Sequence, residues 1–146
     1  MIVHTTRFGP VVIRREDILH FPEGLLGFSD CRDWVILADT CNDAVAWMQS
    51  VDRQEVALPV VSPRRFVPDY QIRVARKEIE PLQLDDVALA QVVVILGKSD
   101  GTLTLNLKAP VILNLQRRLG RQVITNGDLP VRYELELEAP AQKKIA

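Results

Sequence analysis

The chain has 146 residues, of which 47% are hydrophobic and 25% are charged, and its net charge at pH 7 is −1. These values predict one globular domain with a core of its own, and they exclude an intrinsically disordered protein. The sequence pI near 6.1 and the scattering of the basic residues disfavour a dedicated nucleic-acid-binding protein, because such proteins carry a concentrated basic surface.

Short runs rich in β-branched residues, separated at close intervals by Gly, Pro, Asn and Asp, indicate an all-β sandwich or barrel. The chain is predicted to open with a hairpin that turns at Gly9-Pro10 and to continue with a second hairpin that turns at residues 39–43. Two further strands are predicted before the middle of the chain. The strands expected in this part of the chain span residues 1–8, 11–14, 34–38, 44–50, 56–61 and 70–75.

The clearest hairpin joins residues 90–96 to residues 102–107. Its turn contains Asp100-Gly101, a step that supplies the positive φ required by tight hairpin turns. Leucines alternate with polar residues along the second of these strands, and residues 131–138 alternate apolar with charged side chains in the same way. A period of two is typical of half-buried strands.

Helical signals are few, and the longest predicted helix has only two turns because Pro81 opposes its extension. Short helical turns are expected at residues 28–33, 63–66 and 77–84. The predicted fold is therefore all-β: a single domain over residues 1–138, formed by an antiparallel, barrel-like curved sheet with a few short helical turns. Residues 139–146 are expected to form a flexible C-terminal tail.

The tripeptide Gly97-Lys98-Ser99 matches the end of a phosphate-binding P-loop, but two other features of that motif are missing. Its first glycine would lie five residues before Gly97, where the chain has Val92. A P-loop also leads into a helix whose N-terminus faces the phosphate, whereas the element predicted here is a strand. The tripeptide is therefore predicted to be part of a hairpin.

Residues suited to catalysis or metal binding are scarce. His4, His20, Cys31 and Cys41 lack the short spacings by which one element presents two metal ligands. The chain has no GxSxG nucleophile motif, and its paired carboxylates lie among charged neighbours rather than in the apolar surroundings that tune an acid. We therefore expect a protein that is not an enzyme and that has no metal and no cofactor.

The sequence also predicts a cytoplasmic protein with reduced thiols. The N-terminus lacks the basic and then apolar layout of a signal peptide. No apolar run approaches the ~20 residues that a membrane-spanning helix requires, so no association with a membrane is expected. With only two cysteines, a disulfide scaffold is excluded.

Residues 21–28 combine two aromatic side chains and two leucines with two glycines, which permit tight bends. The apolar side chains are Phe21, Leu25, Leu26 and Phe28. Two interpretations are open. The segment forms a cap that packs onto one end of the barrel, or it presents an apolar docking surface for a partner.

A series of motifs in order along the chain resembles the FliW family of flagellar assembly factors. The motifs are TRFG at residues 6–9, EDILHFPEGLLGF at 16–28, WMQSVD at 47–52, PDY at 68–70, NLKAPVILN at 106–114 and GRQVI at 120–124. Met48 stands where the family has leucine. The resemblance covers residues 3–124 and fades beyond Ile124.

The resemblance implies an all-β, barrel-like fold and two protein partners. One partner is flagellin, bound in the cytoplasm before its export. The other is the translational regulator CsrA, a small RNA-binding dimer that represses flagellin synthesis. Family members bind one or the other, so free flagellin releases CsrA to silence its own message. Such partner switching needs no catalytic residue, no direct contact with nucleic acid and no assembly of the free protein beyond a monomer.

Two sets of residues are candidate partner contacts. Glu134, Glu136 and Glu138 lie on one face of the predicted last strand, where they would attract a basic regulator or would protect the sheet edge from aggregation. The apolar side chains of residues 21–28 would accept an amphipathic helix of flagellin. A different class of protein also stays open, namely a β-barrel that binds RNA or a small ligand, although only 5% of the residues are aromatic.

Overall fold

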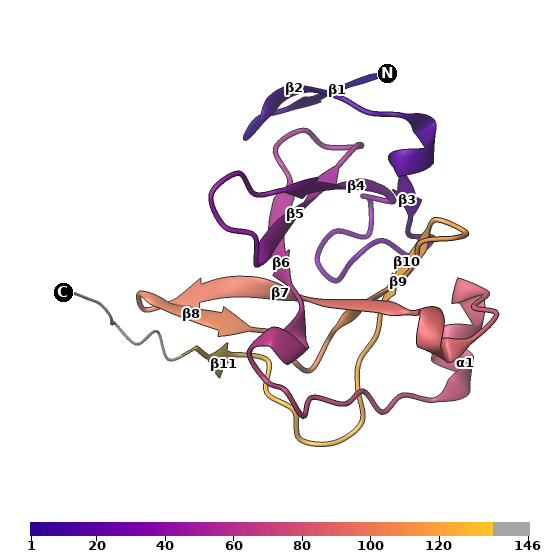
Figure 1. Cartoon of the computed structure of the whole chain (residues 1–146), viewed down its shortest axis with the longest axis vertical. Helices are drawn as coiled ribbons and strands as arrows, with labels where there is room; N and C mark the ends of the chain where they lie inside the picture. Colours follow the sequence, from indigo (N-terminus) through magenta and orange to yellow (C-terminus); the bar gives the residue numbers. More distant parts are fainter. Residues whose placement is uncertain (136–146) are drawn as a thin grey trace.

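A computed structural model describes residues 1–135 and contains a closed barrel of seven strands. The barrel closes because β7 pairs with β6 on one side and with β9 on the other (Figure 1). The seven strands, in their order around the barrel, are β7 (Gln91–Ser99), β6 (Ala57–Val61), β5 (Val45–Ser50), β4 (Asp33–Ala38), β3 (Leu19–His20), β10 (Leu119–Gln122) and β9 (Val111–Asn114). The predicted all-β, barrel-like fold is confirmed.

One seam of the barrel is very short. Strand β10 pairs with β3 in parallel through the single register pair Leu119–His20, whereas the other strand pairs within residues 1–135 are antiparallel. The amide of His20 donates to the carbonyl of Arg118 at 2.8 Å across this seam. Closure of the barrel therefore depends on a contact between segments far apart in the sequence.

The remaining strands lie outside the barrel. Strands β1 (Ile2–Thr5) and β2 (Gly9–Val12) form a separate hairpin above β4 and β5. Strand β8 (Thr102–Leu105) continues the sheet from β7, and β11 (Tyr133–Glu134) pairs with β8 at the outer edge. These two strands form an arm that extends to one side of the barrel (Figure 1).

The helical elements are a single turn each. They are η1 (Arg15–Asp17), η2 (Pro63–Arg65), α1 (Arg76–Ile79), η3 (Glu80–Leu82) and η4 (Val87–Leu89). The turns predicted at residues 63–66 and 77–84 correspond to η2 and to α1 with η3. Pro81 lies in the short η3. No longer helix runs through this residue, because proline has no backbone N–H to donate to the preceding turn. Residues 28–33 form a non-helical turn instead.

An aromatic cluster fixes the first hairpin to the barrel. The guanidinium of Arg7 lies 4.0 Å above the ring of Trp47, and Phe8 meets the same ring edge-on at a centroid distance of 5.8 Å. The indole nitrogen of Trp47 donates to Asp39 at 2.9 Å, and this hydrogen bond holds the pKa of that carboxyl below its usual value. These residues sit in the first hairpin and on the barrel wall, so they join the two.

The sequence and the structure differ in three further respects. The first hairpin turns at residues 6–8, and Gly9-Pro10 belong to β2, because Thr5 Oγ1 closes the turn by bonding to Gly9 and Phe8. Residues 70–75 form no strand, although their side chains alternate, because no neighbouring strand pairs with them in residues 1–135. Strands β3, β9 and β10 were not predicted.

The C-terminal strand is described only in part. Strand β11 contains Tyr133 and Glu134, opposite Leu105 and Thr104 of β8. The rest of the predicted strand from residue 136, together with the predicted tail at 139–146, lies outside the described residues. The division into one domain and a tail stays a prediction.

Candidate interaction surfaces

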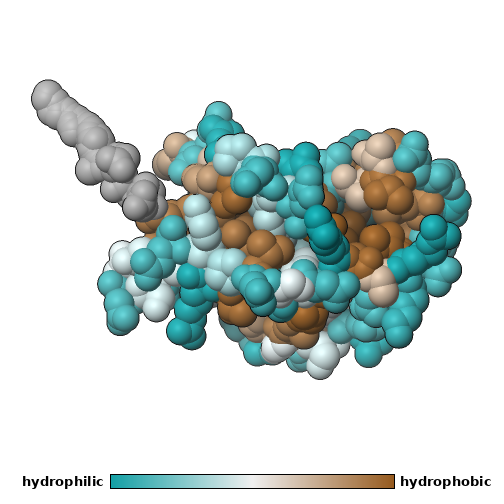
Figure 2. Space-filling view, turned by 90° about the horizontal axis from the view of Figure 1, so that it is seen from below, coloured by the Kyte–Doolittle hydropathy of each residue, from teal (hydrophilic) through white to brown (hydrophobic). Residues whose placement is uncertain are grey.

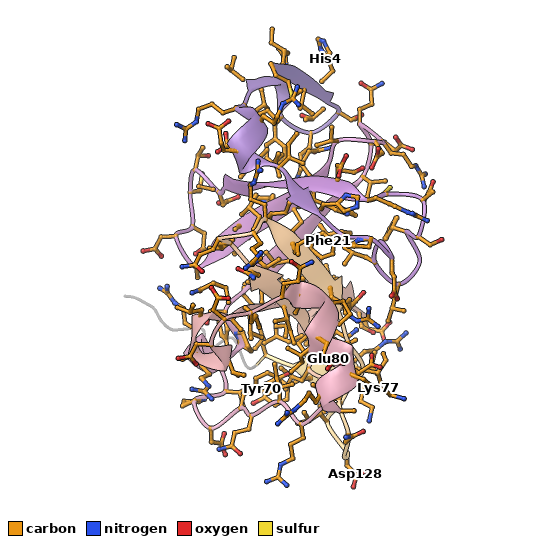
Figure 3. All side chains as sticks on the ribbon, turned by 90° about the vertical axis from the view of Figure 1, so that its right-hand side faces the viewer. His4, Phe21, Tyr70, Lys77, Glu80 and Asp128 are labelled. Atoms are coloured by element: carbon orange, nitrogen blue, oxygen red, sulfur yellow. The ribbon has the colours of Figure 1, made fainter. Side chains whose placement is uncertain are left out.

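The loop that follows β3 is anchored by Phe21. Its ring has no exposed surface and packs edge-on against Trp34, with the ring centroids 6.4 Å apart. The other side of the ring faces Gly120 of β10 so closely that a Cβ atom there would lie 2.2 Å from the ring. Phe21 therefore fills the barrel core between β4 and β10 (Figure 3).

The same loop then makes a tight turn that exposes one leucine. Leu25 and Phe28 exchange backbone hydrogen bonds, and Gly27 between them has the positive φ of 85° that glycine adopts without strain. Gln122 Oε1 accepts a hydrogen bond from the amide of Leu26 at 2.8 Å. This bond fixes the tip of the loop, so the Leu26 side chain is held outward with 60% of its surface exposed.

The four apolar residues predicted in this loop do not form one surface. Phe21 and Leu25 are buried in the core, and Phe28 is half-buried against it. Because Phe21 and Leu25 are buried, a docked helix would not reach their side chains in this structure, and a role of this loop in binding a partner stays a prediction. Of the four, Leu26 is the most exposed side chain.

Arg121 connects this loop to α1. Its Nη1 lies 2.7 Å from Glu23 in the loop, and its Nη2 lies 3.3 Å from Glu78 in α1. The side chain is only 18% exposed, so these charges interact more strongly than they would in open solvent. The sequence indicated neither this link nor the bond from Gln122, because both partners are distant along the chain.

The acidic candidates lie on the arm of the sheet. Glu134 is exposed on β11, opposite Thr104 of β8. Glu136 and Glu138 lie outside the described residues, so whether the three carboxylates form a row stays a prediction. Their nearest described neighbour along the strand, Leu135, donates its amide to Leu103 at 2.9 Å, which keeps the chain against the sheet up to that point.

A groove that the sequence did not indicate lies beneath β7. It has a volume of about 750 Å³ and is open to solvent on the face shown in Figure 2, where hydrophobic side chains lie between polar ridges. We call it the lower groove. Its apolar wall contains Ile72, Val74, Ile79, Val87, Val92 and Ile112.

Tyr70 lines the lower groove. Its hydroxyl donates to the carbonyl of Leu107 at 2.7 Å, and only 4% of the residue is exposed. Burial raises the pKa of Tyr70 to about 12, because the phenolate is poorly solvated there. The carbonyl of Tyr70 accepts from Arg64 Nε at 3.0 Å, which places that guanidinium at the rim.

The residues suited to metal binding are dispersed. Among residues 1–135, no three His, Cys, Asp or Glu side chains lie close enough together to hold a metal ion. His20 is at the exposed end of β3, where Nδ1 lies 2.8 Å from Asp33 Oδ1. Cys31 is buried and Cys41 is exposed.

The GKS tripeptide also has its predicted place. Gly97, Lys98 and Ser99 lie at the end of β7, and Asp100-Gly101 form the turn to β8 with φ values of 51° and 81°. Both residues of the turn are thus left-handed, as a tight hairpin requires.

The part of the chain that the structure describes has no helix long and apolar enough to cross a membrane.

Comparison with known proteins assigns the family. The profile described as FliW protein matches residues 2–135. This chain belongs to the FliW family. The flagellar assembly factor FliW of Bdellovibrio bacteriovorus is 39% identical over 135 residues, which cover 90% of this chain and 77% of the relative. FliW of Thermoanaerobacter pseudethanolicus is 33% identical over 131 residues, or 88% of this chain and 87% of the relative.

A crystal structure of the flagellar assembly factor FliW has the same fold. It superposes with a TM-score of 0.85 at 29% identity, covering 96% of this chain and 100% of that one. The resemblance found in the motifs is therefore confirmed. The FliW relatives are named as assembly factors rather than as enzymes, which agrees with the dispersed arrangement of reactive side chains.

Proposed function

We propose that this chain is a non-catalytic, cytoplasmic flagellar assembly factor that binds flagellin before export and otherwise binds and antagonises CsrA. The observation that carries the proposal is membership of the FliW family over nearly the whole described chain. The exposed leucine held by a rigid loop and the exposed carboxylate of β11 support a role in protein binding.

Mass action is sufficient for the proposed switch. When two proteins bind one carrier and exclude each other, a rise in one lowers the occupancy of the other by an amount set by concentrations and affinities. Flagellin that accumulates unexported would therefore release CsrA, which would then repress further flagellin synthesis.

The switch can be tested with purified proteins. The chain is mixed with CsrA and then titrated with flagellin, both from the same organism, and the complexes are separated by gel filtration with light scattering. We expect a free monomer, a complex with each partner, and loss of the CsrA complex as flagellin is added. If neither partner co-elutes with the chain, the proposed function is wrong.

Leu26→Ser should weaken flagellin binding without destabilising the fold. The side chain is exposed, and such a change usually alters the free energy of unfolding by less than about 0.5 kcal/mol. Binding is measured by calorimetry and stability by thermal unfolding. Val12→Ser is the matched control, because Val12 is 80% exposed on the distant first hairpin. Equal flagellin affinity in the two variants would show that Leu26 does not contact flagellin.

Replacing Glu134, Glu136 and Glu138 together by Gln should weaken binding to CsrA, mostly by slowing association. Charges near an interface act over about a Debye length, so the difference from the parent should shrink as salt is added. A gel-shift assay of CsrA on its RNA measures how much parent or variant is needed to release the RNA. Unchanged antagonism at low salt would leave the carboxylates only a role in protecting the sheet edge.

A further inference from the structure

Residues 71–75 have the pattern of a strand but lack a partner strand. The side chains of Ile72 and Val74 pack into the core, while those of Gln71, Arg73 and Ala75 are exposed. The carbonyl of Arg73 accepts from the amide of Asn126 at 2.7 Å. Within residues 1–135, however, the amides of residues 71–75 donate no hydrogen bond. They stay available to an incoming backbone.

The directions of these backbone groups follow from the alternation. In an extended chain, successive residues direct their amide and carbonyl groups to opposite edges. Because Arg73 faces Asn126, Ile72 and Val74 direct theirs to the other edge. These two residues also line the lower groove, so the unpaired backbone edge runs along the groove.

A second open edge lies across the lower groove. Strand β6 leaves β7 after the register pair Val61–Val94 and continues into η2. On that side of β7, Gln91 and Val92 have no strand partner within residues 1–135, since both pair only with β9 on the opposite side. Both residues line the groove.

The charged side chains that line the lower groove are both positive, and the nearby carboxylate of Asp86 accepts from the amide of Ala88 at 2.9 Å. Its lining contains Arg64 and Arg73 and neither Asp nor Glu. Neither arginine forms an ion pair with another residue in the described part of the chain. Lys77 of α1 and Glu80 of η3 are exposed and do not line the groove. An occupant with a carboxylate would complement it.

The apolar surface of the lower groove does not end at its rim. Its apolar wall continues onto the open surface at Val87, which is 70% exposed, and towards Leu89, which is 42% exposed. Exposed apolar surface that runs on from a groove is typical of a site for protein binding.

We propose that the lower groove binds an extended peptide segment of a partner protein that has alternating apolar side chains and at least one carboxylate. The segment adds as a strand to Ile72 and Val74, its apolar side chains enter the groove, and its carboxylate binds Arg64 and Arg73. Strand addition of this kind gains affinity from backbone hydrogen bonds and specificity from alternate side chains. Neither Leu26 nor Glu134 lines the groove, so loss of peptide binding here and loss of binding at those residues can be measured separately.

The test uses the full chain and a displayed library of random peptides of roughly a dozen residues, long enough for one strand. We expect selected peptides to alternate apolar residues and to contain Asp or Glu. Binding of a selected peptide, measured by fluorescence anisotropy, should fall about tenfold or more in R64Q/R73Q, because two charge contacts are lost. Arg76→Gln is the control, since Arg76 is exposed on α1 outside the groove lining.

Two further measurements separate the proposal from its rivals. Ala88→Trp places a large ring in the groove and should abolish binding, with thermal unfolding confirming that the variant is folded. Hydrogen exchange should show protection of the Ile72 and Val74 amides when the peptide is bound. The proposal is overturned if no peptide is selected, if A88W binds as the parent does, or if a bound peptide is helical and leaves both amides unprotected.

Discussion

Gly120→Ala should destabilise the barrel by about 3 kcal/mol, near the upper end of the usual cost of overpacking a core. An added Cβ would lie between 2.2 and 2.6 Å from three atoms of the Phe21 ring. The ring has little room to withdraw, because it is fully buried and packs edge-on against Trp34. Urea unfolding of the variant and the parent measures the difference.

A second substitution shows whether this contact is the cause. Phe21→Leu alone should destabilise by leaving a cavity, yet in combination with Gly120→Ala it should recover part of the loss, because the smaller side chain leaves space for the new methyl group. Gly97→Ala is the matched control: its Cβ would meet only the Thr104 hydroxyl, at 3.1 Å. Equal losses in G120A and G97A would contradict the packing argument.

The stability of the protein should fall between pH 10 and pH 12 through Tyr70. The folded state raises the pKa of this hydroxyl from 10.0 to about 12. The contribution of Tyr70 to the free energy of unfolding is therefore fully present below pH 10, and it is lost as the pH rises through the pKa of the folded state. Raising this pKa from 10.0 to about 12 corresponds to roughly 2–3 kcal/mol of folding stability below pH 10.

Tyr70→Phe separates this effect from other alkaline titrations. The variant leaves the carbonyl of Leu107 without its hydrogen bond, which should cost about 1–3 kcal/mol near neutral pH. Urea unfolding of both proteins from about pH 8 to about pH 11.5 gives the difference in stability. That difference should narrow as the pH rises. A constant difference would show that Tyr70 does not lose its proton on unfolding in this range.

The sequence predicted those parts of the fold that depend on local chemistry. Asp100-Gly101 occupy the turn that their φ preference indicated, and η2 begins at Pro63. Strand β9 was missed because its four residues are all buried and so lack alternation, and β10 because Gly120 interrupts any pattern. Gly120 leaves space for the ring of Phe21, and this long-range contact cannot be read from a local sequence pattern.

The candidate sites show the same division between local and distant causes. Composition identified residues 21–28 as an apolar loop, but which leucine points outward is decided by Gln122 and the positive φ of Gly27. The lower groove was missed for a similar reason. Residues 70–75 have the alternation of a strand, and alternation does not say whether a partner strand exists.

The short seam between β3 and β10 delays closure of the barrel during synthesis. The ribosome releases β3 first among the barrel strands, whereas β10 emerges only after all the others. Until then β3 lacks its partner on one side and the Phe21 ring lacks the surface of β10. A nascent chain therefore presents an unpaired sheet edge and an exposed aromatic ring to its surroundings, and late closure of this kind favours slow folding and attracts chaperones.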